Sequence, residues 1–310
     1  MNNLFKIGHY SDLKNITGCT VILCPSDTVA SCHVCGSAPG SRELALLSPE
    51  KKISEIHALF LTGGSAFGLN ATSGVVKYLE EKKIGYKTSF AKVPLVPAAV
   101  IYDLNIGSSK IRPNESNAYQ ACLEADSDFF MEGSVGAGTG ATIGKWSGIS
   151  GAMKGGLGVS ELKLDNAWVK AVSIVNSVGD VVDENGKILA GARDSKGNFI
   201  AQDDRLIRWK FHQTGFVENT VLGVILTNVI ISKLQAYNLA HRAQNGLARA
   251  IIPANTSYDG DVIFALSHGK ISLNEEILSE MATEALRQSI ISGIRKAQSL
   301  AGVPAIADNT

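Results

Sequence analysis

The chain has 310 residues, 45% hydrophobic and 19% charged, with 31 glycines and 8 prolines, which excludes disordered, collagen-like and coiled-coil proteins. Its 29 basic and 29 acidic residues give a formal net charge of zero, so no net field would hold a nucleic acid or an anionic membrane. A small molecule or a peptide is therefore the expected partner. The N-terminus lacks the apolar core of a signal peptide and no stretch approaches the roughly 18 apolar residues of a membrane span, so we expect a soluble cytoplasmic protein.

Apolar runs bounded by glycine, proline or asparagine predict six strands: Thr20–Cys24, His57–Thr62, Ala98–Leu104, Val169–Asn176, Val221–Thr227 and Val262–Leu266. A first helix is predicted after the second of these strands, where apolar residues from Phe67 to Leu79 recur at helical spacing. Gly85 stands where the C-terminal cap of this helix is expected.

Two further helices are predicted from capping-box pairs. Ser232 and Gln235 open one, whose apolar face extends to Ala250. Ser272 and Glu275 open the other, which is expected to reach about Gly302. Strands and helices interleave without a strict βα repeat, which favours a layered α/β or α+β fold over a barrel. A length of 310 residues allows one large domain or two, at about 100–200 residues per domain.

The sequence Gly63-Gly64-Ser65-Ala66-Phe67 joins a predicted strand to a predicted helix, as the nucleophile elbow of a serine hydrolase does. Phe67 occupies the position that needs glycine in such an elbow. We therefore expect the two glycines to turn the chain and Ser65 to cap the helix. The exposed amides at the start of this helix could still polarise a substrate.

The run from Gly136 to Trp146 invites comparison with a phosphate-binding loop. The register fails, because Thr139 stands in place of the first glycine and Trp146 in place of the serine or threonine that binds magnesium. A relaxed dinucleotide fingerprint fits Gly136, Gly138 and Ala141, but no clear amphipathic helix follows. Close backbone packing is the favoured interpretation. A nucleotide-binding enzyme is the alternative, and thermal stabilisation by nucleotides would reveal it.

Five cysteines are present, and only Cys32-His33-Val34-Cys35 has the spacing of a metal or redox site. A zinc site would need a second pair of ligands, and the sequence offers none. None of the six histidines forms an HExxH pair or another metal pair. We therefore expect reduced thiols, histidines that serve packing or the surface, and no metal or cofactor.

From Asp183 to Glu218 the chain becomes polar and charged, which predicts a long surface excursion. The excursion ends at Asn219-Thr220, where an apolar strand begins. Cleavage of that bond would make Thr220 an N-terminal threonine, with a hydroxyl group and a free α-amine on one residue. Such an amine, with a pKa of ~7.7–8.0, can act as the base for its own hydroxyl group, so no histidine is needed.

Asp259-Gly260-Asp261 places two carboxyl groups two residues apart, just before the last predicted strand. Taken alone, this motif is typical of a turn. A catalytic role for the pair therefore depends on its context in the whole chain.

Seven blocks of the sequence resemble those of the DmpA-type aminopeptidases, peptidase family S58. They occur in unbroken order from about Ser37 to Gly269: SAPGSRELALLSPE, ALFLTGGSAFGLNATSGVVKYLEE, PLVPAAVIYDL, GSVGAGTGATIGKW, MKGGLG, NTVLGVILTN and NGLARAIIPANTSYDGDVIFALSHG. The set is highly specific, although each glycine-rich block alone is not. The family includes β-peptidyl aminopeptidases, D-aminopeptidase-type enzymes and nylon-oligomer endohydrolases.

The resemblance implies one hydrolase domain over residues 1–310 with a four-layer αββα sandwich. It also implies an N-terminal-nucleophile enzyme that cuts itself ahead of a serine or threonine and then hydrolyses amide bonds through an acyl-enzyme. Asn219-Thr220 falls on the cleavage position, which makes Thr220 the nucleophile and gives fragments 1–219 and 220–310. A homo-oligomer is implied as well, a tetramer of processed heterodimers.

The resemblance also assigns the other site residues. Asp259 and Asp261 match the acidic pair with which the nylon-oligomer branch orients and tunes the new amine. Tyr102 matches a position for substrate contact and proton placement. Lys145 matches a position that gives cationic support to the nucleophile, and Asn176 one that stabilises an oxyanion.

Asn255 departs from the histidine common at its place, which bears on substrate preference more than on the reaction. Release of N-terminal residues from short peptides or amides is the expected activity, with endo-cleavage of linear ω-amino-acid oligomers as the alternative. A relative that keeps the fold only as a binding scaffold is the alternative of another class. The presence of Thr220 together with Asp259 and Asp261 argues against that scaffold.

Overall fold

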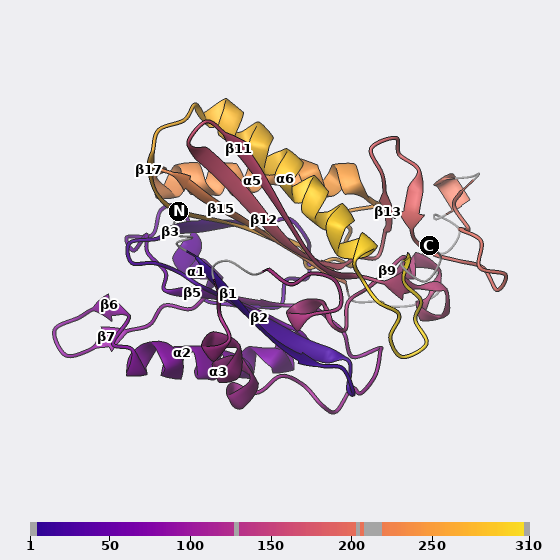
Figure 1. Cartoon of the computed structure of the whole chain (residues 1–310), viewed down its shortest axis with the longest axis horizontal. Helices are drawn as coiled ribbons and strands as arrows, with labels where there is room; N and C mark the ends of the chain where they lie inside the picture. Colours follow the sequence, from indigo (N-terminus) through magenta and orange to yellow (C-terminus); the bar gives the residue numbers. More distant parts are fainter. Residues whose placement is uncertain (1–4, 127–129, 203–204, 208–218, 307–310) are drawn as a thin grey trace.

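Two five-stranded sheets lie face to face and carry helices on their outer sides, in the computed structural model of the chain (Figure 1). The structure describes residues 5–126, 130–202, 205–207 and 219–306. Helices α2 (Thr72–Glu81) and α3 (Glu115–Leu123) cover the first sheet, and α5 (Lys233–Ala250) and α6 (Glu275–Arg295) cover the second. The arrangement is a four-layer αββα sandwich, so the predicted fold class is confirmed.

The first sheet has the strand order β1-β2-β5-β8-β4. Its central pair, β5 and β8, is parallel and connected through α2, whereas the other pairs are antiparallel. The strands are β1 (Lys6–Asp12), β2 (Thr17–Leu23), β4 (Ser41–Arg42), β5 (Ala58–Thr62) and β8 (Ala98–Val100).

The second sheet has the strand order β11-β12-β15-β17-β3. The parallel pair β15 and β17 is connected through α5, and the remaining pairs are antiparallel. The strands are β3 (Val29–Val34), β11 (Gly156–Leu164), β12 (Ala167–Asn176), β15 (Thr220–Val229) and β17 (Val262–Ile271).

Alternation along the strands sorts their side chains into separate cores. On β15, Leu222 and Val224 face the first sheet, whereas Val221 and Ile225 pack under α5 and α6. A third core joins the outer face of the first sheet to α2 and α3. Strands buried on both faces read as continuous apolar runs, which is why the six predicted strands fall on β2, β5, β8, β12, β15 and β17. The prediction was wrong at the end of β8, which stops at Val100 rather than Leu104.

The helix predicted after β5 is present, but both of its ends differ from the prediction. It begins as a 3₁₀ helix, η1 (Ser65–Ala71), in which Ser65 is the first residue at φ 53 and Gly64 holds the preceding left-handed position at φ 82. Ser65 is therefore not the cap. At the other end Ile84 N–H donates to Leu79 O and Lys83 takes φ 57, so a Schellman motif closes α2 before Gly85.

The second predicted helix is confirmed, since Ser232 and Gln235 form a reciprocal capping box at the start of α5. The third prediction was wrong at both ends. The side chain of Asn274, not Ser272, accepts the first amides of α6, and the helix ends at Arg295 rather than Gly302. Asparagine and serine are comparable caps, so the spacing alone could not choose between them.

The predicted surface excursion is partly ordered in its described portion. β14 (Ile188–Ala190) pairs with β13 (Asp180–Val182), which pairs with β16 (Ile251–Ile252). Ala192 and Ala201 are buried in a small cluster with Trp146 and Val178. Small residues at irregular spacing can be buried without leaving a period in the sequence, so the pattern missed this packing. The remaining residues of the excursion, 203–204 and 208–218, lie outside the described residues.

Shorter elements complete the described chain. They are α1 (Leu44–Leu47), β6 (Tyr86–Lys87), β7 (Lys92–Val93), η2 (Gly136–Gly138), β9 (Thr142–Ile143), η3 (Lys145–Ser147), η4 (Ile149–Gly151), β10 (Met153–Lys154) and η5 (Arg205–Ile207). No helix within these ranges is long and apolar enough to cross a membrane.

Candidate active site

Thr220 is the first residue of β15, in the middle of the second sheet, and is 5% exposed. Its partner across the antiparallel ladder is Asn176, the last residue of β12. On the other side, the parallel strand β17 follows Asp261 directly. The sheet therefore brings together three residues that are far apart in the sequence.

The hydroxyl group of Thr220 lies against the peptide bond that precedes it. Thr220 Oγ1 is 2.5 Å from the carbonyl oxygen of Asn219, and the backbone N–H of Gly260 donates to the same oxygen at 2.8 Å. A Cβ atom at Gly260 would lie 2.8 Å from Thr220 Oγ1 and 2.5 Å from Ala38 O. Only glycine fits between these groups, so the glycine of the DGD motif is part of the site.

The two carboxyl groups of the motif are buried on either side of this glycine. Asp261 Oδ1 accepts the N–H of Val221 at 2.6 Å, next to the nitrogen that cleavage would free. Burial, and after it the charge of Asp259, raises the pKa of Asp261 to about 8. Asp259 Oδ2 accepts the N–H and the hydroxyl group of Thr256 at 2.8 and 2.7 Å, and burial raises its pKa too.

Lys145 is completely buried and its ammonium group is held by Asn176, with Nζ 2.9 Å from Oδ1 and 3.3 Å from the backbone oxygen. The charge of Lys145 lowers the pKa values of Asp259 and Asp261, in opposition to their burial. Lys145 is therefore the cation of the site. Asn176 Oδ1 also accepts the N–H of Thr142 at 3.0 Å.

Tyr102 reaches the site through its backbone: its carbonyl oxygen accepts Asn176 Nδ2 at 3.2 Å. Its phenol group is half-buried and makes no hydrogen bond to any described residue. The donor on the carbonyl of Asn219 is thus the amide of Gly260, while the side-chain amide of Asn176 is engaged with Tyr102. All six predicted site residues are grouped here, and their catalytic roles remain predictions.

A further buried acid, Asp103, follows Tyr102 in the chain. Asp103 accepts the N–H of Gly64 and the hydroxyl group of Thr17, both at 2.7 Å, and burial raises its pKa. A Cβ atom at Gly63 would lie 2.1 Å from Asp103 Oδ2. The glycine pair after β5 therefore makes room for this carboxyl group instead of forming a nucleophile elbow.

Lys154 fixes the loop that leads to Lys145. Its buried Nζ donates to Thr139 O at 2.8 Å and to Ala141 O at 2.6 Å, and burial lowers its pKa to about 7. Opposite charge on Asp103 acts against that shift. Asp103 and Lys154 thus support the two segments that contact the side chain of Asn176.

Sequence reasoning missed Gly260, Asp103 and Lys154. The first was treated as a spacer in a turn. A signal did exist for Asp103, the one charged residue in the predicted apolar strand Ala98–Leu104, because a carboxyl group in such a place must be satisfied by buried donors. Lys154 sits in a glycine-rich block, where a buried cation has backbone carbonyl oxygens as its natural partners.

The other motifs behave as packing elements. A Cβ atom at Gly138 would lie 2.3 Å from Leu157 N, so the glycine-rich run serves close backbone approach, as expected. All five cysteines are free, and burial raises the pKa of the thiols of Cys32 and Cys35 to about 12. No group of three metal-ligating side chains occurs within the described ranges. His212 lies outside them.

A profile of peptidase family S58 matches residues 5–306, nearly the whole chain. The chain belongs to peptidase family S58. A protein of Mycobacterium tuberculosis named an uncharacterized aminopeptidase is 33% identical over 98% of this chain and 95% of its own length. A 6-aminohexanoate-oligomer endohydrolase of Paenarthrobacter ureafaciens is 30% identical over 91% of this chain and 81% of its own. This S58 protein is a hydrolase of amide or peptide bonds.

Solved structures show the same fold. The L-aminopeptidase D-Ala-esterase/amidase of Ochrobactrum anthropi, described as a variant of the Ntn hydrolase fold, superimposes with a TM-score of 0.74 at 16% identity over 97% of this chain and 86% of its own. A β-aminopeptidase of a Burkholderia species gives 0.71 at 18% identity, with coverage of 97% and 87%. The S58 chain therefore has the Ntn-hydrolase-like fold that its sequence blocks implied.

Proposed function

We propose that the chain is the precursor of an N-terminal-nucleophile hydrolase that cuts itself between Asn219 and Thr220 and then uses Thr220 as its nucleophile. One observation carries the proposal: the hydroxyl group of Thr220 lies 2.5 Å from the carbonyl oxygen of Asn219, and that oxygen already accepts the N–H of Gly260. Nucleophile, target carbonyl and oxyanion donor are thus assembled before any cut.

Self-cleavage would proceed in two steps. Thr220 Oγ attacks the carbonyl carbon of Asn219, and the oxygen of Asn219 becomes an oxyanion that the N–H of Gly260 stabilises. The C–N bond then breaks, the nitrogen takes the proton of the hydroxyl group, and an ester joins the two residues. Water hydrolyses this ester and leaves fragments 1–219 and 220–310, the second with a free α-amine on Thr220.

In the processed enzyme the new amine would act as the base for the Thr220 hydroxyl group, since an α-amine of pKa ~7.7–8.0 is partly neutral near pH 7. The substrate acylates Thr220 and water releases the product. Asp261, bound to the adjacent N–H of Val221, is placed to hold the ammonium form. We assign cationic support to Lys145, and substrate contact and proton placement to Tyr102. Oxyanion stabilisation is assigned to Asn176 through the second hydrogen of its side-chain amide, since the first is donated to Tyr102 O.

The substrate we propose is a short peptide or amide with a free amine, from which the N-terminal residue is released, with small or β-amino acids preferred. The relatives named aminopeptidases support this choice. Linear ω-amino-acid oligomers are the second candidate, supported by the endohydrolases at 30% identity and by the aspartate pair. We also propose that the processed protein forms a homo-oligomer, which sedimentation would test.

Intact-mass measurement tests the processing step. We expect the purified wild-type chain to yield the two fragments 1–219 and 220–310, and Thr220→Ala to remain one chain. A wild-type protein that stays full length through long incubation contradicts the assignment of Thr220.

Substrate comparison tests the activity. The processed enzyme is offered a free-amine peptide amide, its N-acetylated twin and an aminohexanoate oligomer, and the products are separated by chromatography. We expect cleavage of the free-amine compound only, with a roughly 10²–10⁴-fold slower rate in Asp259→Asn or Asp261→Asn if acid–base catalysis is lost. Equal cleavage of the acetylated twin excludes the aminopeptidase, and internal cuts in the oligomer establish the second candidate.

A further inference from the structure

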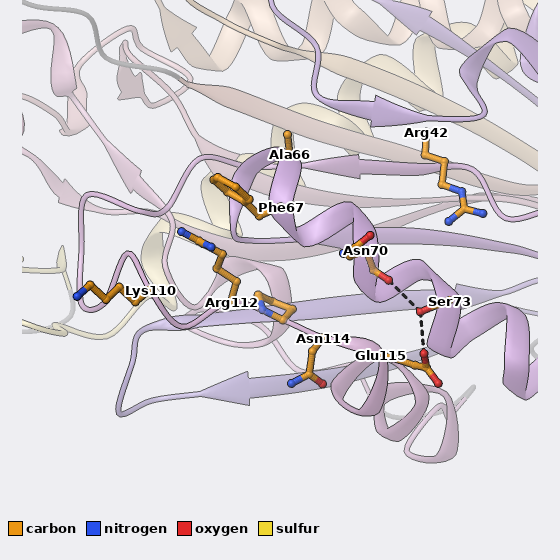
Figure 2. A pocket seen from close by; sticks show the side chains of 10 residues that line it. Arg42, Ala66, Phe67, Asn70, Ser73, Lys110, Arg112, Asn114 and Glu115 are labelled. Carbon is orange, nitrogen blue, oxygen red and sulfur yellow. Dashed lines mark hydrogen bonds between the residues drawn. The ribbon is translucent and has the colours of Figure 1, made fainter.

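A pocket of about 750 Å³ opens beside η1, outside the group of residues around Thr220 (Figure 2). Its walls come from three segments: the end of β4, the stretch from η1 into α2, and the loop that enters α3. The lining residues are Arg42, Ala66, Phe67, Asn70, Ser73, Lys110, Arg112, Pro113, Asn114 and Glu115. Three of these ten are cationic and one is acidic.

The three cations have no counter-ion in the described part of the chain. Arg42, Lys110 and Arg112 form no ion pair and no side-chain hydrogen bond there. The acidic residue, Glu115, is engaged elsewhere, because Ser73 donates to it at 3.2 Å and Lys77 lies 3.9 Å away. The pocket therefore carries excess positive charge and a set of unused N–H donors.

Arg112 is fixed in this pocket. Its guanidinium group lies over the ring of Phe67, 3.9 Å from the ring centroid, which gives a contact to a phenylalanine that is 59% exposed (Figure 2). Its aliphatic stem packs on Gly64, where a Cβ atom would lie 3.0 Å from Arg112 Cβ. Nε of Arg112 is buried without an acceptor. A cation held in place with an unused donor is preorganised for an anionic ligand.

The Arg112 side of the pocket is linked to the candidate active site through the backbone and two hydrogen bonds. Gly64, which supports the stem of Arg112, donates its N–H to Asp103 at 2.7 Å. Asp103 follows Tyr102, whose carbonyl oxygen holds the side chain of Asn176. Two hydrogen bonds and the Tyr102–Asp103 peptide bond thus join Gly64 to Asn176, the strand partner of Thr220.

The Arg42 side is linked to the site through the chain. Arg42 pairs with Ala98 at the edge of the first sheet, and four residues earlier Ala38 donates its N–H to Asp259 O at 3.0 Å. The segment between Ala38 and Arg42 therefore leads from the DGD motif to the pocket. Both cationic walls are thus linked through the backbone to segments of the candidate site.

We propose that Arg112 binds a carboxylate group, supplied either by the far end of a short peptide substrate or by a separate small carboxylate, and that Arg42 and Lys110 add positive charge to the walls of the pocket (Figure 2). A carboxylate accepts N–H donors in pairs, which suits guanidinium groups, and it would neutralise the excess charge of the pocket. The peptide source rests on the proposed function, since it requires a substrate with its scissile bond at Thr220. Direct binding is therefore measured separately from turnover.

The experiment uses calorimetric titration of the uncleaved Thr220→Ala protein and of the processed wild type. The probes are trialanine with a free C-terminal carboxylate, trialanine amide, and succinate. Arg112→Gln removes the proposed contact, Arg42→Gln and the charge reversal Lys110→Glu reduce the positive charge of the pocket, and Lys87→Gln is the matched control, an exposed cation on β6 outside the pocket. Lys110 is exposed on a loop, so its variant keeps the test valid if Arg112→Gln fails to fold.

With the peptide as source, we expect the free acid to bind roughly 5- to 20-fold more tightly than the amide, the effect of one charge-assisted hydrogen bond at a partly exposed site. Arg112→Gln abolishes that preference, Arg42→Gln and Lys110→Glu weaken it, and Lys87→Gln retains it. With a separate carboxylate as source, succinate binds, Arg112→Gln loses it, and acid and amide bind equally. Absence of both effects overturns the proposal, as does a carboxylate preference that survives undiminished in Arg112→Gln and Lys110→Glu. Loss of turnover with intact binding counts only against the proposed function.

Discussion

Asp261 is a residue whose charge the fold disfavours although the proposed chemistry uses it. It is buried beside Asp259, and its pKa of about 8 lies far above the ordinary 3.8. Between about pH 4 and pH 8, Asp261 keeps its proton in the folded protein, whereas in the unfolded chain it has released it. Folding stability contributed by this group therefore falls as pH rises from about 4 to about 8, and it stays constant above that range.

Asp261→Asn removes this titrating group, so the folding stability of the variant should depend less on pH. We expect the wild-type protein to lose stability relative to the variant between pH 5 and pH 8, both carried in the Thr220→Ala background so that each remains one chain. Urea denaturation at several pH values measures the difference. Parallel stability curves for the two proteins would show that Asp261 ionises normally in the folded state.

Gly260 is a second residue whose identity is fixed by its neighbours. In Gly260→Ala the new Cβ atom would meet Thr220 Oγ1 and Ala38 O at 2.8 and 2.5 Å, closer than carbon and oxygen atoms pack. We expect the hydroxyl group to be displaced and self-cleavage to slow by roughly 10²-fold or more, the scale of a lost oxyanion donor. Gel electrophoresis over time measures the rate. Ser257→Ala, an exposed change in the same loop, is the control and should cut normally.

Among the elements, the junction between β8 and η1 depends on one carboxyl group. Asp103 satisfies the N–H of Gly64 and the hydroxyl group of Thr17 away from water. In Asp103→Ala both donors lose their acceptor, which costs about 1–3 kcal/mol for each buried group left unsatisfied. Asp103→Asn keeps an acceptor oxygen and is the matched control. We expect the alanine variant to be clearly less stable than the asparagine variant in urea denaturation, whereas equal stabilities would mean that the junction does not depend on this acceptor.

Element interiors were predictable from the sequence, and element ends were not. The capping box of Ser232 was found because two side chains at a fixed spacing satisfy each other. The start of α6 was missed because Asn274 caps alone, two residues after a serine that offers the same spacing by chance. Lys83 took the left-handed position expected of Gly85, since the geometry of the Schellman bond decided the end of α2 rather than intrinsic preference.

At the scale of the whole molecule, the four layers were predicted through resemblance, whereas periodicity alone gave only a layered α/β or α+β fold. The pairing of Asn176 with Thr220 follows from strand order, which no local pattern encodes. The same holds for the carbonyl oxygen of Tyr102 on Asn176, because any residue type supplies a carbonyl group. The sequence motifs thus predicted which side chains form the site, whereas its backbone contacts depend on the strand order and could not be predicted.

The proposed cut would divide the strands of the second sheet between the two fragments. Strands β15 and β17 would belong to fragment 220–310, while β12 on one side and β3 on the other belong to fragment 1–219. The smaller fragment would thus be hydrogen-bonded on both flanks by the larger one. We expect the pair to remain together in gel filtration without denaturant, and separation under native conditions would contradict this strand order.

Because of this strand order, the peptide bond between Asn219 and Thr220 is needed for folding, whereas the folded protein no longer needs it. While the chain is intact, β15 finds its place between β12 and β3 by an intramolecular search. After the cut, the same step becomes an encounter of two chains, which slows on dilution. Unfolded Thr220→Ala should therefore refold at a rate independent of concentration, whereas unfolded processed protein should recover slowly or not at all when dilute. The mature molecule would then persist because it unfolds slowly, and its single opportunity to fold would come before it cuts itself.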